Sequence, residues 1–375
     1  MKILFVLEEL TPVDGRGRVV IEIGRRMLQR GDDVHVAAAS GSVDAMRGFH
    51  FHRVPIPAGI PWSLRTLFFA LASALVVSRL RARVDVVHAH GPTFARVDVT
   101  TCHGLHRAAI DVAAQVPDIE RMGLRPADLS RPRLLLPVLE ASMRRGRVVA
   151  LTRRMKRELR ELVGIPADRI DVIPNGVDGS RFAPHLRKGL RPGARRDFQL
   201  ADTPTALFVG HDFKRKGLVR AIQALAHLDS AVLLVLGADP NDLRIQSFVE
   251  CHAEHANLSG RVRFLGSRED VERAYAAADL LLAPSLYEGF CLAVLEALAS
   301  GLPVVGTPPA LPAELGDAGD ALRRVGAQAS SEELASALRR TFGCSADAIE
   351  RHALAVSARF SWSKIAELTR AVYEG

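Results

Sequence analysis

The stretch from Pro284 to Glu296 reads PSLYEGFCLAVLE and follows a short apolar run, Leu280 to Ala283. The apolar run predicts a buried strand, and the stretch after it predicts a loop and then a helix that ends near Gly301. This order places Glu288 in the loop and Glu296 inside the helix, eight residues further on. A helix-terminal charge and a surface glutamate would give the same spacing. The pattern therefore predicts a strand–loop–helix unit first and a pair of functional carboxylates second.

The loop itself is suited to binding a polyhydroxylated or phosphorylated ligand. Gly289 has no Cβ and lets a ligand approach the backbone closely. The amides of Phe290, Cys291 and Leu292 fall in the first helical turn, where N–H groups lack intrahelical partners and can bind phosphate or sugar oxygens. Two carboxylates beside such a turn would accept hydrogen bonds from the hydroxyls of a ribose and a hexose.

A basic loop, Gly210 to Gly217 (GHDFKRKG), follows the predicted strand Ala206 to Val209. Arginine offers a planar fork of donors and lysine a point charge, so Arg215 and Lys216 would bind a diphosphate, with Gly210 marking the strand end. A solvated basic loop explains the same residues equally well.

A third loop, Gly15-Arg16-Gly17-Arg18, lies between the first predicted strand, Lys2 to Leu7, and a helix over Arg18 to Arg30. The spacing is not GxGxxG, so the dinucleotide fingerprint is excluded. Gly15 and Gly17 would still let backbone N–H groups approach a pyrophosphate.

The motifs of metal and nucleotide-hydrolysis sites are missing from the sequence. It contains no GxxxxGK[ST], no Asp-x-Asp and no HExxH, so we expect no metal and no cofactor. Negative charge on a leaving group would then be neutralised by Arg215, Lys216 and helix N-termini. His88 and His90 flank Ala89 at the end of a predicted strand, and His103 lies in the run Thr101 to Gly104. Each is more often structural than catalytic.

The chain has 375 residues, a length that suits two domains. Short apolar runs alternate with amphipathic stretches in both halves, which indicates parallel βαβ units. We predict an α/β fold of two Rossmann-like domains that face each other across a cleft. The first would span 1–180 with a C-terminal helix at 361–375, the second 204–360, and a segment rich in Arg, Pro and Gly at 181–203 would link them.

The net charge is +8, and the basic excess is concentrated between Arg121 and Arg160, which holds twelve Lys or Arg against three acidic residues. One interpretation is a solvated helix surface. Another is a surface for anionic membrane lipid or a phosphorylated acceptor. Nucleic acid ranks last, because only 5% of residues are aromatic and no nucleic-acid-binding motif accompanies the charge.

Several features indicate a cytoplasmic protein. The four cysteines form no CxxC pair, which fits a reducing compartment. The apolar start, Met1 to Leu7, is too short for a signal peptide. The longest apolar stretch, Thr66 to Ser78, has thirteen residues, whereas a spanning helix needs about twenty. We expect a cytoplasmic chain, at most peripheral on the inner face of the plasma membrane.

Taken together, these motifs resemble those of the retaining GT-B glycosyltransferases of family 4. Glu288-x7-Glu296 within EGFCLAVLE resembles the signature of that family, and the run GHDFKRKGL is similar to its lipopolysaccharide-core glucosyltransferase branch. Three further segments also match: GLPVVGT (301–307), IPNGVD (173–178) and AAADL (276–280).

The resemblance implies a role for each matching residue. Arg215 and Lys216 would bind the donor diphosphate, and Glu296 the ribose hydroxyls. Glu288, with the backbone at Gly289 and Phe290, would hold the donor sugar. Four further positions are implied on the acceptor side or in the cleft: Gly15 and Gly17 near the phosphates and acceptor, His103 as a cleft histidine, and Asp98 as an acidic residue of the core-transferase branch.

The sequence departs from the family pattern at two places. Asp212 stands where many members have an arginine, and Arg16 separates the two N-terminal glycines. The function implied is retaining, metal-independent transfer of a hexose from a nucleotide-diphosphate sugar, with UDP favoured, to a glycan, lipid-linked or small-molecule acceptor. The alternatives are a non-catalytic nucleotide-sugar-binding subunit, a GT-B sugar-nucleotide epimerase and a nucleic-acid binder.

Overall fold

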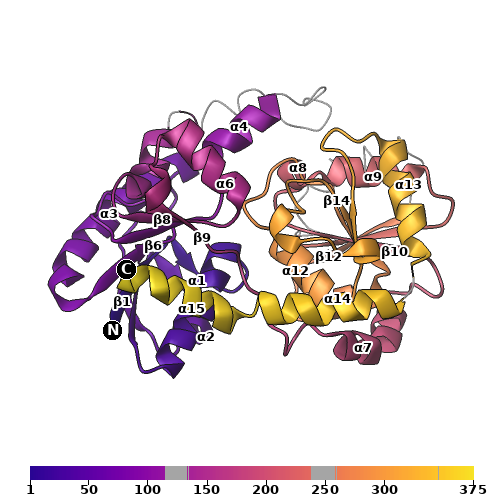
Figure 1. The fold of residues 1–375 in the computed structure, drawn as a ribbon, viewed down its shortest axis with the longest axis horizontal. Coiled ribbons are helices and arrows are strands. Elements are labelled where there is room, and N and C mark those ends of the chain that lie inside the picture. Colours follow the sequence, from indigo (N-terminus) through magenta and orange to yellow (C-terminus); the bar gives the residue numbers. More distant parts are fainter. Residues whose placement is uncertain (115–132, 134, 238–257, 259, 345) are drawn as a thin grey trace. The chain divides into compact units, whose positions relative to one another are not determined.

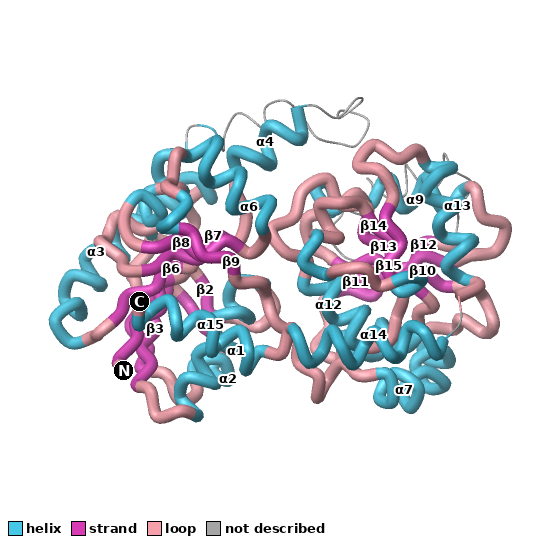
Figure 2. Tube along the Cα trace, viewed as in Figure 1, coloured by secondary structure: helices cyan, strands magenta, loops and turns pink. Residues whose placement is uncertain are grey.

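The computed structural model describes residues 1–114, 133, 135–237, 258, 260–344 and 346–375. The chain divides into two compact units. The first comprises Met1–Asp111, Pro126–Gly176 and Trp362–Gly375, and the second comprises Val112–Arg125 and Val177–Ser361. Each unit has a parallel sheet with helices on both faces (Figures 1 and 2). The predicted α/β class with two Rossmann-like halves is confirmed.

The sheet of the first unit has seven parallel strands in the order β5-β3-β1-β6-β7-β8-β9. The strands are β1 Lys2–Val6, β3 Asp33–Ala38, β5 His50–Arg53, β6 Val86–Ala89, β7 Val99–Cys102, β8 Arg147–Ala150 and β9 Ile170–Val172, and a small separate pair is formed by β2 Glu9–Leu10 and β4 Ser40–Gly41. The helices are α1 Gly15–Gln29, α2 Val43–Met46, α3 Trp62–Leu80, α4 His106–Ala114, α6 Arg153–Glu158 and α15 Trp362–Glu374, with a π-helical turn at Leu159–Val163 and 3-10 turns at η1 Arg81–Arg83, Ala141–Arg144 and Ala167–Arg169. Leu4, Val6 and Val87 are fully buried together with Phe69 of α3, so burial of this apolar core fixes the sheet in place.

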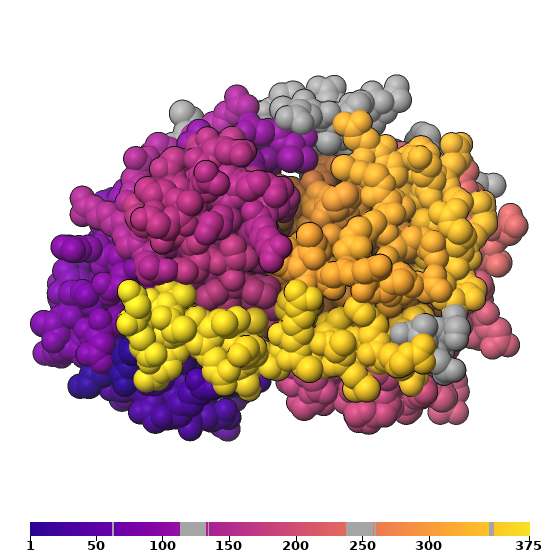
Figure 3. Space-filling model, in the orientation of Figure 1, coloured from indigo at the N-terminus to yellow at the C-terminus, as the bar shows by residue number. Residues whose placement is uncertain are grey.

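The last helix, α15, packs on α1 in the first unit and lies over its N-terminal residues (Figure 3). Arg370 of α15 forms an ion pair with buried Asp32, which also accepts a hydrogen bond from the chain's amino group at 3.0 Å. Tyr373 Oη lies 2.7 Å from Nδ1 of His88 on β6. These polar contacts thus join the C-terminal helix to residues that lie more than 280 positions earlier in the sequence.

The sheet of the second unit has six parallel strands in the order β12-β11-β10-β13-β14-β15. The strands are β10 Thr205–Val209, β11 Val232–Leu236, β12 Val262–Gly266, β13 Leu280–Ala283, β14 Val304–Gly306 and β15 Leu322–Arg324. The helices are α7 Pro184–Asp197, α8 Phe213–Lys216, α9 Leu218–Ala226, α11 Val271–Ala277, α12 Leu292–Ala299, α13 Ser331–Phe342 and α14 Ala346–Arg359, with 3-10 turns at Ala313–Leu315 and Gly319–Ala321. Five predicted strands of this half appear within one residue of the expected bounds.

The segment expected as a linker, 181–203, contains helix α7, which packs against α11. Arginines spaced by four residues explain this packing. Arg187 donates to the Ala278 carbonyl at 2.7 Å, Arg191 to the same carbonyl at 2.7 Å, and Arg195 to the Ala277 carbonyl at 2.8 Å. The last carbonyls of a helix lack partners within it and attract cations. These arginines obscured the helical pattern in the sequence. In the structure they attach α7 to α11 of the second unit.

Within the described residues, no helix is both long enough and apolar enough to span a bilayer.

Candidate active site

The second unit brings two sequence motifs together at the carboxyl edge of its sheet. β10 and β13 are neighbouring parallel strands, so the loops that follow them leave from the same edge. Arg215 Nη1 lies 3.0 Å from Glu288 Oε2, and Lys216 Nζ lies 2.8 Å from Glu288 Oε1. We call these three residues the cation–carboxylate cluster. Sequence analysis predicted both motifs but not that their side chains pair directly.

Neighbouring groups hold the cluster in this geometry. Asp212 caps α8, accepting from the Arg215 amide at 3.2 Å and from Arg215 Nε at 2.9 Å. Arg215 Nη1 also donates to the Tyr287 carbonyl at 2.7 Å. Ser285 Oγ donates to Glu288 Oε1 at 3.3 Å. The departure at Asp212 thus has a structural reason, because its carboxylate orients the arginine beside it.

Electrostatics keeps the cluster charged. Glu288 is only 6% exposed, and burial alone would raise the pKa of its carboxyl. The charges of Lys216 and Arg215 and their hydrogen bonds outweigh burial and lower that pKa to about 2. Burial likewise opposes the charged form of Lys216, but its neighbours, Glu288 among them, raise the pKa of this ammonium. All three groups are therefore ionised at neutral pH.

Gly210 lies directly under the lysine. A Cβ added there would be 2.0 Å from Lys216 Cδ and 2.6 Å from Cε, distances that real Cβ atoms do not adopt. The absence of a side chain at this strand end is what lets Lys216 run across it to Glu288.

Gly210→Ala is expected to displace Lys216 from Glu288 while leaving the fold intact, because the clashing atoms belong to a flexible side chain. Losing a charge-assisted hydrogen bond of roughly 1.5–3 kcal/mol should weaken nucleoside diphosphate binding at least about tenfold. Isothermal titration calorimetry measures this, with Gly189→Ala in α7 as the control, since an added Cβ there meets nothing within 4 Å. Equal affinity in Gly210→Ala and wild type would contradict the role of Lys216.

Helix α12 begins at the end of the loop that follows β13, as predicted. Cys291 is the N-cap residue and makes no side-chain capping bond, and Leu292 begins the helix. Phe290 and Cys291 are buried at 6% and 4% exposure. Gly289 precedes them in a loop that leads from Glu288 into this turn. Backbone donors of a first helical turn therefore lie next in the chain to the cation–carboxylate cluster.

Glu296 occupies the middle of α12 and is 7% exposed. Its Oε2 accepts a hydrogen bond from the Tyr275 hydroxyl at 2.6 Å. Sequence analysis did not identify Tyr275, which lies 21 residues earlier on α11. A tyrosine inside an apolar helix is the only sequence sign of such a partner. The bond fixes one carboxylate oxygen of Glu296.

The first unit has its own polar cluster at the carboxyl edge of its sheet. His90 follows β6 and His103 follows β7, which are neighbouring strands. Nδ1 of His90 lies 2.8 Å from Nε2 of His103. Burial lowers the pKa of His90 to about 3 and places that of His103 well below its usual value, so both rings are neutral at pH 7. One ring must then donate to the other, and the pair is a fixed hydrogen bond between neutral imidazoles.

This burial predicts an acid-sensitive first unit. Below pH 6.5 the unfolded chain binds a proton at His90 that the folded chain does not, so stability falls as pH falls, down to about pH 3. His90 alone should contribute a slope of up to ~1.4 kcal/mol per pH unit. Urea unfolding between pH 6.5 and 5.5, about one unit above the usual pKa of a glutamate carboxyl, measures the slope. His90→Gln should reduce the slope, while His88 and His103, whose pKa values burial also lowers, keep part of it. An unchanged slope would contradict the assignment.

The glycines of the first loop are not where the sequence placed them. Gly15 and Gly17 lie in the first turn of α1 rather than before it, because Asp14 caps the helix and accepts from the Gly17 amide at 3.4 Å. A Cβ on Gly17 would be 2.3 Å from the Thr11 carbonyl oxygen. The glycine at 17 is thus required by close backbone packing. Arg16 extends toward Glu8 at the end of β1, with Nη2 3.9 Å from its carboxylate.

Asp98 is separated from this cluster. It precedes β7 and so lies at the amino edge of the sheet, whereas His103 follows the same strand. Its Oδ1 accepts from Arg81 at 3.0 Å and its Oδ2 from the Val87 amide at 2.8 Å. The carboxylate therefore ties strand ends together, and we leave it out of the candidate site.

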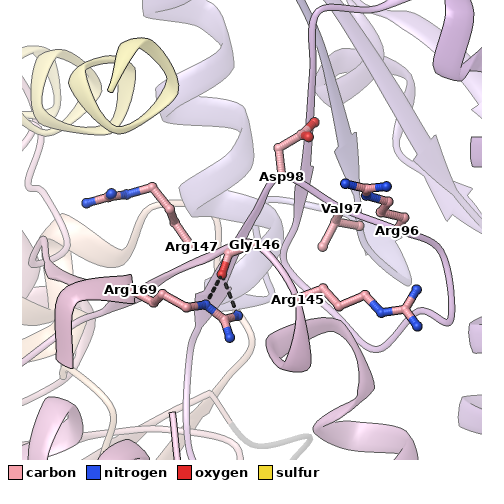
Figure 4. Close-up of a pocket in the computed structure, with 7 residues that line it drawn as sticks. All are labelled: Arg96, Val97, Asp98, Arg145, Gly146, Arg147 and Arg169. Atoms are coloured by element: carbon pink, nitrogen blue, oxygen red, sulfur yellow. Dashed lines mark hydrogen bonds between the residues drawn. The ribbon is translucent and has the colours of Figure 1, made fainter. Parts of the chain in front are cut away.

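Asp98 instead borders a cavity of about 530 Å³ at the amino edge of β7, β8 and β9. Figure 4 shows Arg169 bonded to the Gly146 carbonyl, while the side chains of Arg145 and Arg147 point apart. The guanidinium of Arg147 pairs with Asp171 at 2.8 and 2.9 Å. The lining cations do not converge on one point, so the cavity is not a second candidate active site.

Comparison with known proteins agrees with this geometry. A family model of glycosyltransferase family 4 matches residues 13–181, and a model of glycosyl transferases group 1 matches residues 193–358. Together they span the chain except for its ends and a short stretch between them. The folds of both halves match the GT-B architecture. The chain belongs to glycosyltransferase family 4.

The individual relatives share a minority of their residues with the chain. The chain is 37% identical over 240 residues to D-inositol 3-phosphate glycosyltransferase of Nocardia farcinica, an alignment that covers 59% of the chain and 51% of that protein. It thus spans about half the length of this curated relative. It is 26% identical to lipopolysaccharide glucosyltransferase WaaG of Escherichia coli over 82% of the chain and 80% of WaaG.

Solved structures share the fold over the whole chain. A crystal structure of WaaG superposes with a TM-score of 0.79 at 23% identity, covering 100% of both chains. HepE of Anabaena, solved in complex with UDP-glucose, has a TM-score of 0.75 at 18% identity and covers 100% of this chain and 99% of its own. At these identities the likeness shows the fold.

Proposed function

We propose that the chain is a glycosyltransferase that moves a hexose from a nucleotide-diphosphate sugar to an acceptor. The observation that carries the proposal is the cation–carboxylate cluster, which combines two half-buried cations and a buried carboxylate beside the start of α12. Membership of family 4 supports the same activity.

In the proposed mechanism, Arg215 and Lys216 bind the diphosphate and stabilise the charge that grows on it as the sugar leaves. Glu288 would accept from a sugar hydroxyl while Arg215 and Lys216 hold its carboxylate in place. Glu296 would bind the ribose, with one oxygen fixed by Tyr275. The amides at Gly289 to Leu292 would bind phosphate or sugar oxygens.

We further propose that transfer retains the anomeric configuration and needs no metal. The two cations of the cluster supply the charge that a metal would otherwise provide. No enzymic nucleophile was identified in the sequence, so front-face attack assisted by the leaving phosphate is the mechanism most consistent with these residues. Anomeric configuration in the product, read by NMR, tests this directly.

Uridine diphosphate sugars are the favoured donors, and the HepE complex with UDP-glucose supports this choice within the shared fold. The acceptor would be a glycan, a lipid-linked sugar or a small molecule. The names of WaaG and of the D-inositol 3-phosphate glycosyltransferase support a lipid-linked or a phosphorylated acceptor. We propose a cytoplasmic location.

The basic segment Arg121–Arg160 is a less favourable membrane surface than its charge suggested. Residues 115–132 and 134 lie outside the described residues. In the described part, Arg147 pairs with Asp171, and Lys156 donates to the Ile170 carbonyl at 2.5 Å. Membrane binding through this segment stays a prediction.

Release of nucleoside diphosphate from UDP-, GDP- and ADP-sugars tests the activity, with and without EDTA and with a panel of sugar, inositol phosphate and lipid-extract acceptors. Acceptor-dependent release that EDTA does not reduce is the expected result. Binding without release would favour a non-catalytic subunit, and a changed sugar nucleotide without an acceptor would favour an epimerase. Either outcome would contradict the proposal.

A further inference from the structure

Helix α3 carries a stripe of apolar side chains on its solvent face. Leu64, Phe68, Leu71 and Leu75 are 45%, 42%, 50% and 64% exposed, and their spacing of four, three and four residues puts them on one side of the helix. Phe94 is 45% exposed and its amide bonds to the Ala70 carbonyl at 3.1 Å. Of the nine large apolar side chains that are exposed in the described residues, four form this stripe, and Phe94 lies in a segment that is hydrogen-bonded to α3.

The opposite side of α3 already provides the contacts that the fold needs. Thr66, Phe69, Ala70, Ser73 and Val77 are at most 2% exposed. The helix is therefore apolar nearly all round, a composition typical of helices that are buried on every side. Exposed apolar patches of this kind mark interaction sites.

Cations surround the stripe. Residues 62–84 contain four arginines and no acidic residue. Arg79 follows Leu75 by one turn on the same side, and Arg83 lies just beyond in η1; both are exposed. The structure gives neither an ion pair among the residues it describes. The acidic neighbours are Glu9, which pairs with Arg65 at 2.6 Å, Asp98, which pairs with Arg81, and Asp85, which accepts from the Lys2 amide at 2.7 Å.

The cationic surface continues to the amino edge of the sheet. Arg81 of η1 reaches Asp98, which borders the cavity lined by Arg96 and Arg145 (Figure 4). Both arginines are exposed, and neither has an ion pair within the described part of the chain. An apolar stripe thus ends beside several uncompensated positive charges.

We propose that this face, the α3 surface (Leu64, Phe68, Leu71, Leu75 and Phe94, with Arg79, Arg83 and Arg96), docks on a membrane that contains anionic phospholipid. The apolar side chains would enter the boundary between headgroups and acyl chains, while the arginines contact lipid phosphates. A symmetric contact between two copies would instead place like-charged arginines against one another. This proposal is separate from the prediction for Arg121–Arg160, and it does not depend on the proposed activity.

Co-sedimentation of the full chain with vesicles tests the proposal. Vesicles of phosphatidylcholine with about one third phosphatidylglycerol should bind the chain, and pure phosphatidylcholine should bind it much less. Leu75→Glu should weaken binding at least about tenfold, because a charge replaces a side chain that enters the bilayer. Leu354→Glu on α14 is the matched control, since Leu354 is similarly exposed at 69%, and it should bind like wild type.

The arginines give a second arm. Arg79→Ala and Arg83→Ala should each weaken binding to anionic vesicles about fivefold, in line with the contribution of one basic residue at an anionic surface. Thermal melting checks that each variant is folded. The proposal is overturned if wild type does not bind anionic vesicles or if Leu75→Glu binds as well as Leu354→Glu. It is also overturned if Leu75→Glu turns a dimer into a monomer in size-exclusion chromatography without affecting vesicle binding.

Discussion

Glu288→Ala is expected to lower the rate of sugar transfer by at least about 100-fold, comparable to removing one preorganised group that stabilises a transition state. The substitution removes an acceptor for the sugar and also the carboxylate that positions Arg215 and Lys216, at 3.0 and 2.8 Å. Steady-state kinetics with the identified donor measures the loss, which should appear mainly in kcat.

The control for this variant is Glu332→Ala, in the exposed first turn of α13, which should keep wild-type turnover. Breaking a buried ion pair costs stability, about 3–5 kcal/mol when one partner is removed. Assays therefore run well below the melting temperature of the variant. Near-wild-type turnover in folded Glu288→Ala would remove Glu288 from the site.

Lys216→Ala is expected to have the second large effect, on nucleotide binding. A ligand at one hundred times its dissociation constant adds about 2.7 kcal/mol of stability. Losing the contact between this ammonium and the diphosphate should weaken affinity by one to two orders of magnitude, since hydrogen bonds to charged groups contribute roughly 1.5–3 kcal/mol. At least about half of the ligand-induced rise in melting temperature should then disappear.

Lys214→Ala, two residues away on the same short helix, is the matched control and should keep the rise. An equal loss in both variants would indicate a general effect of positive charge in the loop. A full rise in Lys216→Ala would show that the lysine does not contact the ligand.

The local features of the site were predictable because they depend on neighbours in sequence. The strand Leu280–Ala283 and the loop that carries Glu288 follow from an apolar run and a glycine. The basic loop after β10 likewise follows a strand end. Parallel strands then bring both loops to one edge, but the sequence does not reveal that β10 and β13 are adjacent.

What could not be predicted depends on contacts between distant residues. Tyr275 and Glu296 are joined across two helices, and His90 and His103 across two strands. The short strands β5 (HFHR) and β15 (LRR) are mostly polar, so they lack the apolar run that made the equally short β13 and β14 predictable. In α7, arginines that pair with α11 gave the appearance of a linker.

The exposed stripe on α3 illustrates the same limit. The apolar run Thr66–Ser78 predicted a core helix, and one side of α3 is indeed in the core. Because the run is apolar on all sides, only the three-dimensional structure distinguishes Leu71, which is exposed, from Phe69, which is buried.

The central claim is that the cation–carboxylate cluster binds a nucleotide-diphosphate sugar without metal. A thermal-shift screen of the purified chain against UDP, GDP, ADP and their common sugars, with EDTA present, tests it most directly. The account predicts a rise in melting temperature with one nucleotide family, UDP first, that is lost in Arg215→Ala. No rise with any nucleotide, or a rise only when a divalent metal replaces EDTA, would contradict it.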